Sequence, residues 1–270
     1  MLIVNNKGFS STESVMDLFT SARTHHSNIR PSISNLMPGL LFSALMLFQH
    51  QAAAQSIQDF QAKFHVEAMG MNLGIAKHQW QCKQENCFLI SDAKPSGLAA
   101  LFFTDSSLET VSFKQSEKQL LWQGYRKVGF SEKNGTKTQK ITELKLNQDT
   151  VVCPQKNKQW PVKEKMFDAL SIGYAVWHAK LNRQSLDHFV LIDPNFQTEL
   201  KLQSKNNNAR IALDFGEDNM DAVKYHFVSP KADIELWLLP EFNYFPGKVR
   251  IKNQENKTLT LSLAEPPKPL

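Results

Sequence analysis

Glycine is scarce in this sequence, at 11 of 270 residues, and no cluster of glycines forms a loop that could cradle a phosphate. The sequence also lacks the His-Glu-x-x-His spacing of zinc proteases and the Gly-x-Ser-x-Gly turn of serine hydrolases. An enzyme needs a nucleophile with its base, paired carboxylates in a cleft, or metal ligands. We therefore predict a protein that is not an enzyme and that uses no cofactor and no metal.

The histidines do not change this interpretation. Five of them follow residue 54, at positions 65, 78, 178, 188 and 226. Asp187 and His188 resemble an acid–base pair, but neighbours in a strand point to opposite faces of the sheet. A hydrolase whose site is not visible in the sequence remains the enzymatic alternative.

No apolar run reaches the roughly 20 residues with which a helix spans a bilayer. The longest run, Leu36–Phe48, follows a polar segment that carries a few basic residues and precedes Ala52-Ala-Ala54. This order predicts a signal peptide over residues 1–54 with cleavage before Gln55, and Met16 is an alternative start. The expected product is an exported, periplasmic bacterial protein that is not integral to the membrane once processed. A buried helix of a cytosolic protein is the alternative for residues 36–48.

The net charge of the chain points to no particular partner. The formal net charge is +5, and it becomes +4 without the three basic and two acidic residues of the first 54. The lysines are scattered, and a nucleic-acid partner is not expected outside the cytoplasm. Residues 55–264 have the length of a single antiparallel β domain. The proline-rich residues 265–270 are expected to form a flexible tail, and the oligomeric state is left open.

Only three cysteines are present, at positions 82, 87 and 153. Cys82 and Cys87 flank the polar tetrapeptide 83–86 between two strand-like segments. A four-residue hairpin loop would bring them to bonding distance, so we predict a disulfide between them and a buried or free thiol at Cys153. A zinc site that includes His78 is the rival interpretation, although its spacing matches no known ligand pattern.

Alternation of apolar and polar residues dominates the chain after residue 60. It is clearest at Val223, Tyr225 and Phe227, and again at Ile234, Leu236 and Leu238. Period two is typical of antiparallel strands with one buried face. The predicted fold is mainly β, a curved antiparallel sheet or open barrel.

One segment departs from this alternation. Over about 163–182, apolar residues recur at alternating spacings of three and four. This predicts an amphipathic helix packed on the sheet, with a stripe that belongs to the core or lines a ligand pocket. The stripe consists of Phe167, Leu170, Tyr174, Trp177 and Leu181.

Two short motifs carry a family resemblance: Phe167-Asp-Ala-Leu-Ser171 with Tyr174, and Trp237-Leu-Leu-Pro-Glu241 followed by Pro246 and Val249-Arg-Ile251. In these the sequence resembles the DUF-3108 family of exported bacterial proteins, which has no assigned activity. The resemblance implies a mainly antiparallel β architecture with one helix, similar to curved-sheet envelope carriers, and no catalytic residues. The extra cysteines and Gly247 depart from the family pattern.

These features favour an envelope protein that binds an apolar ligand, such as the acyl chain of a lipid, on a concave sheet. A structural or interaction protein of the envelope is the alternative. A continuous cavity of about 300 Å³ or more between helix and sheet would favour the carrier, and a filled core the interaction role. The candidate pocket or interaction residues are Phe167, Leu170, Tyr174, Trp177, Trp237, Tyr244 and Phe245.

Overall fold

The computed structural model describes residues 55–97, 100, 105–116, 118–133, 135–216 and 219–270. The predicted signal peptide, residues 1–54, lies outside them. Among the described residues, no helix is long and apolar enough to cross a membrane.

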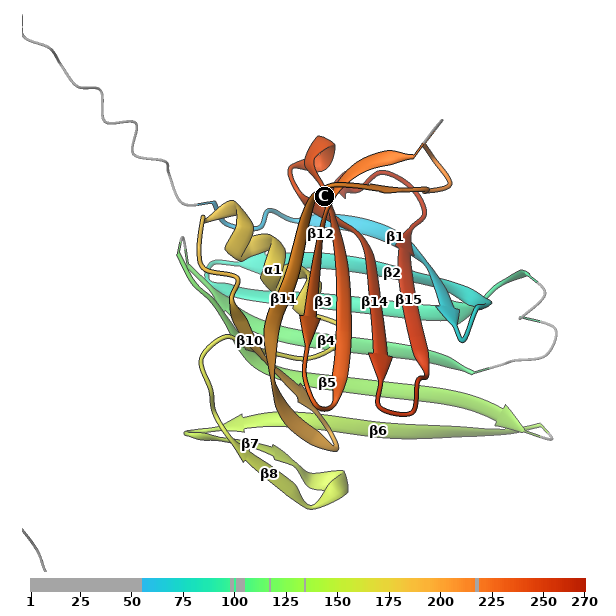
Figure 1. Ribbon diagram of the computed structural model, residues 1–270. Helices are drawn as coiled ribbons and strands as arrows, with labels where there is room; N and C mark the ends of the chain where they lie inside the picture. The colour runs from blue at the N-terminus through green and yellow to red at the C-terminus, as the bar shows by residue number, and fades with distance from the viewer. Residues whose placement is uncertain (1–54, 98–99, 101–104, 117, 134, 217–218) are drawn as a thin grey trace, which may run out of the picture. The chain divides into compact units, whose positions relative to one another are not determined.

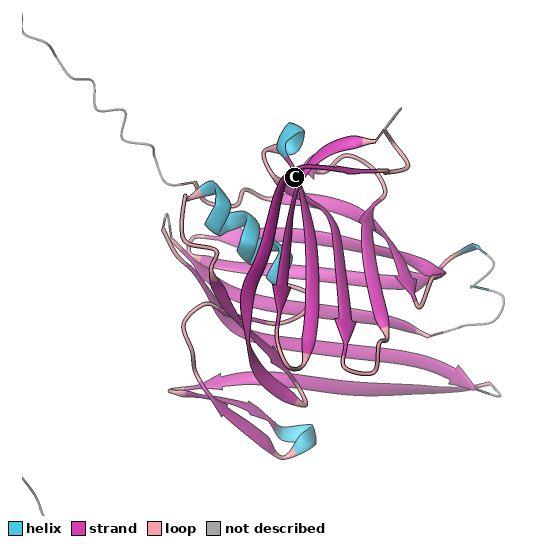
Figure 2. Cartoon of the chain, in the orientation of Figure 1, coloured by secondary structure: helices cyan, strands magenta, loops and turns pink. Residues whose placement is uncertain are grey.

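These residues form sixteen strands and one α-helix, α1, which covers Ile172–Leu181 (Figure 2). The alternating burial along the strands follows the period-two pattern of the sequence. The strands are β1 (Phe60–Ala68), β2 (Met71–Lys83), β3 (Asn86–Pro95), β4 (Ser106–Gln115), β5 (Leu120–Lys133), β6 (Thr136–Asn147), β7 (Thr150–Cys153), β8 (Lys158–Pro161), β9 (Met166–Phe167), β10 (His188–Asp193), β11 (Phe196–Ile211), β12 (Met220–Val228), β13 (Ala232–Leu239), β14 (Phe245–Asn253), β15 (Thr258–Leu263) and β16 (Lys268–Pro269). The chain also contains the 3₁₀ turns η2 (Pro154–Lys156) and η3 (Pro240–Phe242).

All the strands belong to one sheet. Neighbouring strands follow in the order β8 to β1 and then β15 to β9, so that β1 pairs with β15. Strand β16 also pairs with β1. The pairings are antiparallel except that between β9 and β10. The sheet curves so that β11–β15 face β1–β6, with α1 between them (Figure 1). Its end strands β8 and β9 do not pair with each other, so the sheet is open, which confirms the predicted fold class.

Side chains bridge the opening. Lys158 Nζ donates to the carbonyl oxygen of Asn195 at 2.9 Å, and Gln197 Nε2 donates to that of Pro161 at 2.8 Å. These bonds occupy backbone groups near the edge strand β8, where a bare edge would pair with another chain.

The helix is shorter than the predicted span 163–182 and is not amphipathic. Residues 172–179 are all buried, because α1 lies inside the curved sheet instead of covering it from outside. Phe167 belongs to β9, and Asp168 prevents the helix from beginning before Ile172. Its carboxylate accepts the backbone N–H groups of Leu170 and Ser171, the local bonding by which aspartate favours turns over helix interiors.

Cys82 and Cys87 are directly opposite in the β2–β3 hairpin and form a disulfide, and Cys153 is a buried free thiol. The predicted four-residue loop is wrong in length, because Lys83 pairs with Asn86 and leaves a two-residue turn. Residues 265–270, expected to be a flexible tail, are held instead. Glu265 pairs with Lys63 and Lys268, and β16 adds to β1.

Candidate functional site

The concave face of strands β2–β5 changes character along its length. Cross-strand register places inward side chains in rows, so each row can be compared with the next. Two rows are apolar, the next is polar, and the last consists of small residues. In that order they are Cys82–Cys87–Phe113–Trp122, Trp80–Leu89–Val111–Tyr125, His78–Ser91–Glu109–Lys127 and Ala76–Ala93–Ser107–Gly129. We call the two apolar rows, with α1 against them, the filled half, and the polar and small rows the hollow half.

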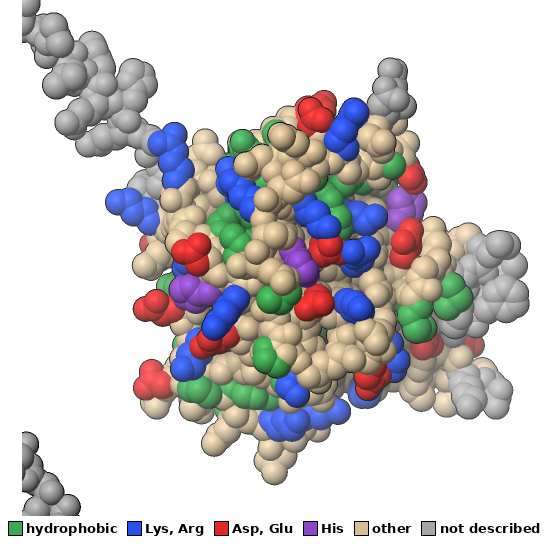
Figure 3. Space-filling model, in the orientation of Figure 1, with side chains coloured by type: hydrophobic (Ala, Val, Ile, Leu, Met, Phe, Trp, Pro, Cys, Tyr) green, Lys and Arg blue, Asp and Glu red, His purple; other side chains and the backbone are tan. Residues whose placement is uncertain are grey.

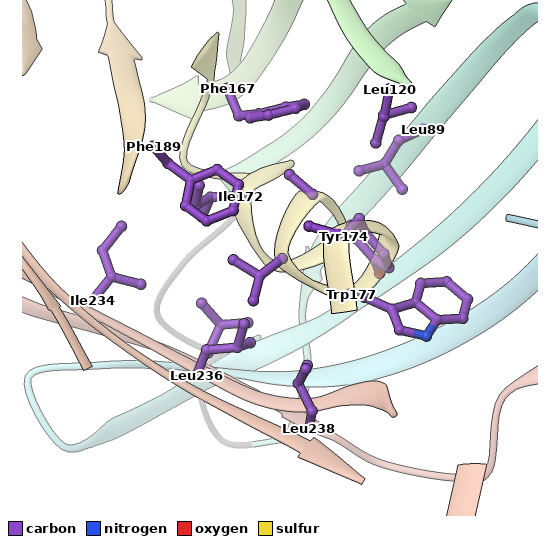
Figure 4. Close-up of a cluster of buried hydrophobic side chains, with 14 of the residues drawn as sticks. Leu89, Leu120, Phe167, Ile172, Tyr174, Trp177, Phe189, Ile234, Leu236 and Leu238 are labelled. Atoms are coloured by element: carbon purple, nitrogen blue, oxygen red, sulfur yellow. The ribbon is translucent and has the colours of Figure 1, made fainter. Parts of the chain in front are cut away.

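The filled half is closed by aromatic packing around α1. The ring of Tyr174 lies 5.5 Å from that of Phe60 and 6.2 Å from that of Trp80, and the ring of Trp177 lies 5.1 Å from that of Phe245. Figure 4 shows the helix side chains between Leu89 and Leu120 on one side and Ile234, Leu236 and Leu238 on the other. Beneath the helix only a niche of about 10 Å³ remains. The space between helix and sheet is therefore filled core, which favours the interaction role at this place, so a carrier site would have to lie elsewhere on the concave face.

Asp168 fixes the start of α1 against this core. One carboxylate oxygen accepts Trp122 Nε1–H at 2.7 Å and Ser171 Oγ–H at 2.9 Å. Burial raises the pKa of Asp168 to about 6, although these hydrogen bonds act in the opposite direction. Each bond is internal to the protein, so Asp168 is a structural residue of the helix start.

The hollow half contains unfilled space. A cavity of about 200 Å³ lies beside Ala169 and Leu170, just before α1 begins. It adjoins a groove of about 490 Å³, with which it shares four lining residues, Val66, Ala93, Ser107 and Lys127. The space exists because a row of alanine, serine and glycine leaves the concave face uncovered. Cavity and groove together fall in the size range of small-molecule sites.

One wall of this cavity is polar. Glu109 accepts hydrogen bonds from Lys127 Nζ at 2.8 Å, Tyr125 Oη at 2.7 Å and Ser107 Oγ at 3.3 Å. The pair between Glu109 and Lys127 leaves no net charge on the wall. Ser91, beside them, is buried and makes no side-chain hydrogen bond to another described residue.

The opposite wall is apolar. It comes from β1, β14 and β15 and from the segment before α1, so a ligand in the cavity would touch a polar and an apolar surface at once. Its side chains are Val66, Leu170, Val249, Ile251, Leu259 and Leu261.

His78 lies where the polar row meets the filled half. It is 2% exposed, and its Nδ1 lies 2.8 Å from the hydroxyl of Tyr174 on α1. Its Nε2 is buried and has no hydrogen-bond partner among the described residues. Burial lowers the pKa of His78 to about 4, more than the nearby Glu109 raises it, so the imidazole is neutral at pH 7. A buried polar atom without a partner carries a free-energy cost and needs an explanation.

Two other depressions are less suited to a ligand. The larger of the two, about 1000 Å³, lies at the other end of the strands and is lined by hairpin residues such as Gln84 and Ser116 together with the last residues of the chain. A groove of about 480 Å³ is bordered by Trp177, Phe245 and residues 55–60. Neither depression is lined by a buried polar atom that lacks a partner among the described residues. The cavity of the hollow half is lined by His78, whose Nε2 is such an atom.

The structure separates the seven residues predicted to form a pocket or an interaction surface. Tyr174, Trp177 and Phe245 belong to the aromatic core around α1, and Phe167 packs on Phe189 at 6.2 Å between ring centroids. Only Leu170 lines the cavity of the hollow half.

The remaining two lie outside that core. Trp237 is on the outer face of β13, where Lys224, Lys248 and Arg250 lie over its ring, and Lys180 lies over the ring of Tyr244 at 4.5 Å. Basic and acidic side chains are interspersed on the face shown in Figure 3. The two rings are therefore covered by cations, and neither forms a bare apolar patch.

Sequence reasoning missed the cavity residues, because Ala76, Ser91 and Ala93 are ordinary small residues in strand-like segments. The described residues contain no group of three or more His, Cys, Asp or Glu that could hold a metal ion.

Comparison with known proteins adds little. No protein-family model matches the chain, and no curated protein matches it. Among solved structures, the chain is similar to a β-barrel-like protein of domain of unknown function DUF1849 from Brucella abortus. The sequences are 10% identical, the match covers 80% of this chain and 99% of that one, and the TM-score is 0.44. At that score the likeness supports no argument about function, and it supplies no positive sign of an enzymatic activity.

Proposed function

We propose that this protein is an exported, non-enzymatic carrier that binds one amphipathic small molecule, such as a single-chain lipid, in the hollow half of its sheet. The observation that carries the proposal is the cavity beside Leu170, where the sheet face turns from bulky to small side chains and leaves space open.

The two walls indicate what would bind. Leu259, Leu261 and Ile251 offer an apolar surface to an acyl chain, and burial of apolar area is the main favourable term in binding such a chain. The row from His78 to Lys127 offers hydrogen-bonding groups to a head. A ligand apolar throughout would leave Nε2 of His78 and the hydroxyl of Ser91 without partners, which disfavours it.

Export is supported by the sequence pattern before Gln55 and by the disulfide between Cys82 and Cys87, since disulfides persist in oxidising compartments.

Binding is tested by titrating lipid-depleted protein with a monoacylglycerol and following tryptophan fluorescence. Ala93 borders both the cavity and the groove, so Ala93→Trp should fill their junction and abolish binding. Leu108→Trp, on the outer face of the adjacent strand, adds the same bulk outside the cavity and is the matched control. Equal affinity in the two variants would rule out this cavity as the binding site.

Export is tested separately by sequencing the N-terminus of the protein from a periplasmic extract. We expect the sequence to begin at Gln55. An intact N-terminus that begins at Met1 or Met16 on cytoplasmic protein would contradict export.

A further inference from the structure

We infer that the ligand is held by a hydrogen bond between Nε2 of His78 and an uncharged head group, so that the protein selects a hydroxyl-bearing single-chain lipid over a free fatty acid. This inference rests on the proposed function and specifies the chemical class of the ligand.

The first observation is the unpaired atom. Nδ1 of His78 is already engaged with the hydroxyl of Tyr174, whereas Nε2 is buried without a partner, and His78 lines both the cavity and the niche beneath α1. Ser91 and Glu109, the polar side chains beside His78 on this wall, line the same cavity. Because Nε2 itself has almost no exposed surface, its neighbouring side chains must move apart before a ligand group can complete the hydrogen bonding of the imidazole.

The tautomer of His78 does not restrict the inference. If the Tyr174 hydroxyl donates to Nδ1, Nε2 carries the proton and donates, and if Nδ1 donates, Nε2 accepts. A ligand hydroxyl can fill either role, whereas a carboxylate can only accept.

The second observation is the balance of charge. The wall holds one carboxylate and one ammonium group, 2.8 Å apart, beside an imidazole that is neutral at pH 7. A ligand carboxylate would place a second negative charge near Glu109 in a partly buried site. An uncharged head avoids both that repulsion and the cost of desolvating an ion.

A single ordered water is the competing occupant of the site. The niche next to His78, about 10 Å³, is near the lower limit for one water molecule, which needs 2–4 polar partners. Apart from His78 and Tyr174, which already bond to each other, the side chains that line the niche are apolar. A water there would be poorly held, which favours a ligand group reaching in from the cavity.

Two substitutions at His78 separate recognition from packing. The amide of glutamine reaches the position of Nε2, whereas that of asparagine stays near Nδ1 and can keep the contact with Tyr174. The affinities of wild type, His78→Gln and His78→Asn for a monoacylglycerol and for the fatty acid of equal chain length should be measured by titration calorimetry at pH 7. We expect wild type to prefer the monoacylglycerol roughly tenfold, His78→Asn to lose roughly tenfold in affinity, and His78→Gln to stay within about threefold of wild type.

Each outcome decides a distinct point. Equal monoacylglycerol affinity in all three proteins would overturn the role of His78 and leave the carrier function standing. A preference of wild type for the fatty acid would overturn the uncharged head, and this comparison needs no variant to fold. If wild type binds neither lipid, the proposed function itself fails. Should His78→Asn not fold, Ser91→Ala provides the second variant, and unchanged monoacylglycerol affinity in it would count against a head group placed on this row.

Discussion

The filled half and the hollow half of the concave face lie on the same strands. From the Trp80 row to the Ala76 row the register is continuous, and a bulge at Ser112/Phe113 shifts the β4–β5 pairing inside the filled half. Between those two rows the difference lies in the inward side chains. Trp80 and Leu89 meet the helix in one half, and the equivalent positions further along β2 and β3 are Ala76 and Ala93. Space is therefore left open where one row has small side chains, while the backbone pairing between these rows is unchanged.

The division also separates stability from binding. Rows of large apolar side chains packed on a buried helix supply most of the burial that stabilises the curved sheet. The hollow half gives up that packing and keeps an unpaired buried nitrogen, and local departures of this kind are expected at functional sites. Substitutions in the two halves should therefore have very different consequences.

The largest effect is expected in the filled half. Trp80 is fully buried, 4.9 Å from the ring of Phe113, and Trp80→Ala would leave a cavity beneath α1. We expect a loss of about 3–5 kcal/mol in the free energy of unfolding, measured by denaturant titration. A loss below about 1 kcal/mol would show that the two halves are not distinct in packing.

At the boundary, His78 should make stability depend on pH. Its pKa is about 4 in the folded protein and near 6.5 when unfolded, so the unfolded state binds more protons between these values. Stability should therefore fall as the pH drops from 6.5 to 4, by about 3 kcal/mol from this group alone. His78→Gln should flatten the curve of unfolding free energy against pH.

Other groups titrate in the same range and are common to both proteins. Burial lowers the pKa of His178 to about 4, which adds a slope of the same sign, and Asp168, with its pKa raised to about 6, adds one of opposite sign. The difference between wild type and variant isolates His78, and parallel curves would contradict its buried, neutral state.

The disulfide lies at the filled end of the face, next to Phe113. Replacing Cys82 and Cys87 together by alanine removes the cross-link of a short loop, and we expect a loss of about 2 kcal/mol on unfolding. Lipid affinity should not change, because the cavity lies at the other end of the strands. A weakened affinity would show that the two ends are coupled.

The smallest effect is expected in the hollow half. Ala93→Leu extends into empty space and should change stability by less than about 1 kcal/mol, whereas Ala175→Leu, inside α1, should cost about 1–3 kcal/mol through overpacking. Thermal denaturation of the two variants compares the same added bulk in each half. Similar losses would mean that the hollow half is packed.

Sequence alone predicts the elements better than the site. Alternation identifies strands such as β12 and β13, and the Cys82–Cys87 spacing identifies the disulfide, because both signals are local. The start of α1 was misplaced, because Phe167 continues an apolar helical spacing while Asp168 bonds the local backbone and ends it. Burial of the helix on all sides depends on the curved sheet around it, which no local pattern reveals.

The candidate site was hidden for a different reason. Ala76, Ala93, Ser107 and Gly129 come from four strands, and only the pairing register makes them neighbours. The aromatic residues that suggested a pocket are instead the material that fills one half. The open space lies where the inward side chains are small, so aromatic residues in the sequence do not mark it.

The most direct test of the central claim is native mass spectrometry of the protein purified from its own cell envelope under gentle conditions, beside Ala93→Trp prepared in the same way. The account predicts an added mass of one single-chain lipid on the wild type and its absence from the variant. A wild-type spectrum that shows only the bare chain across several detergents, or the same lipid on both proteins, would contradict it.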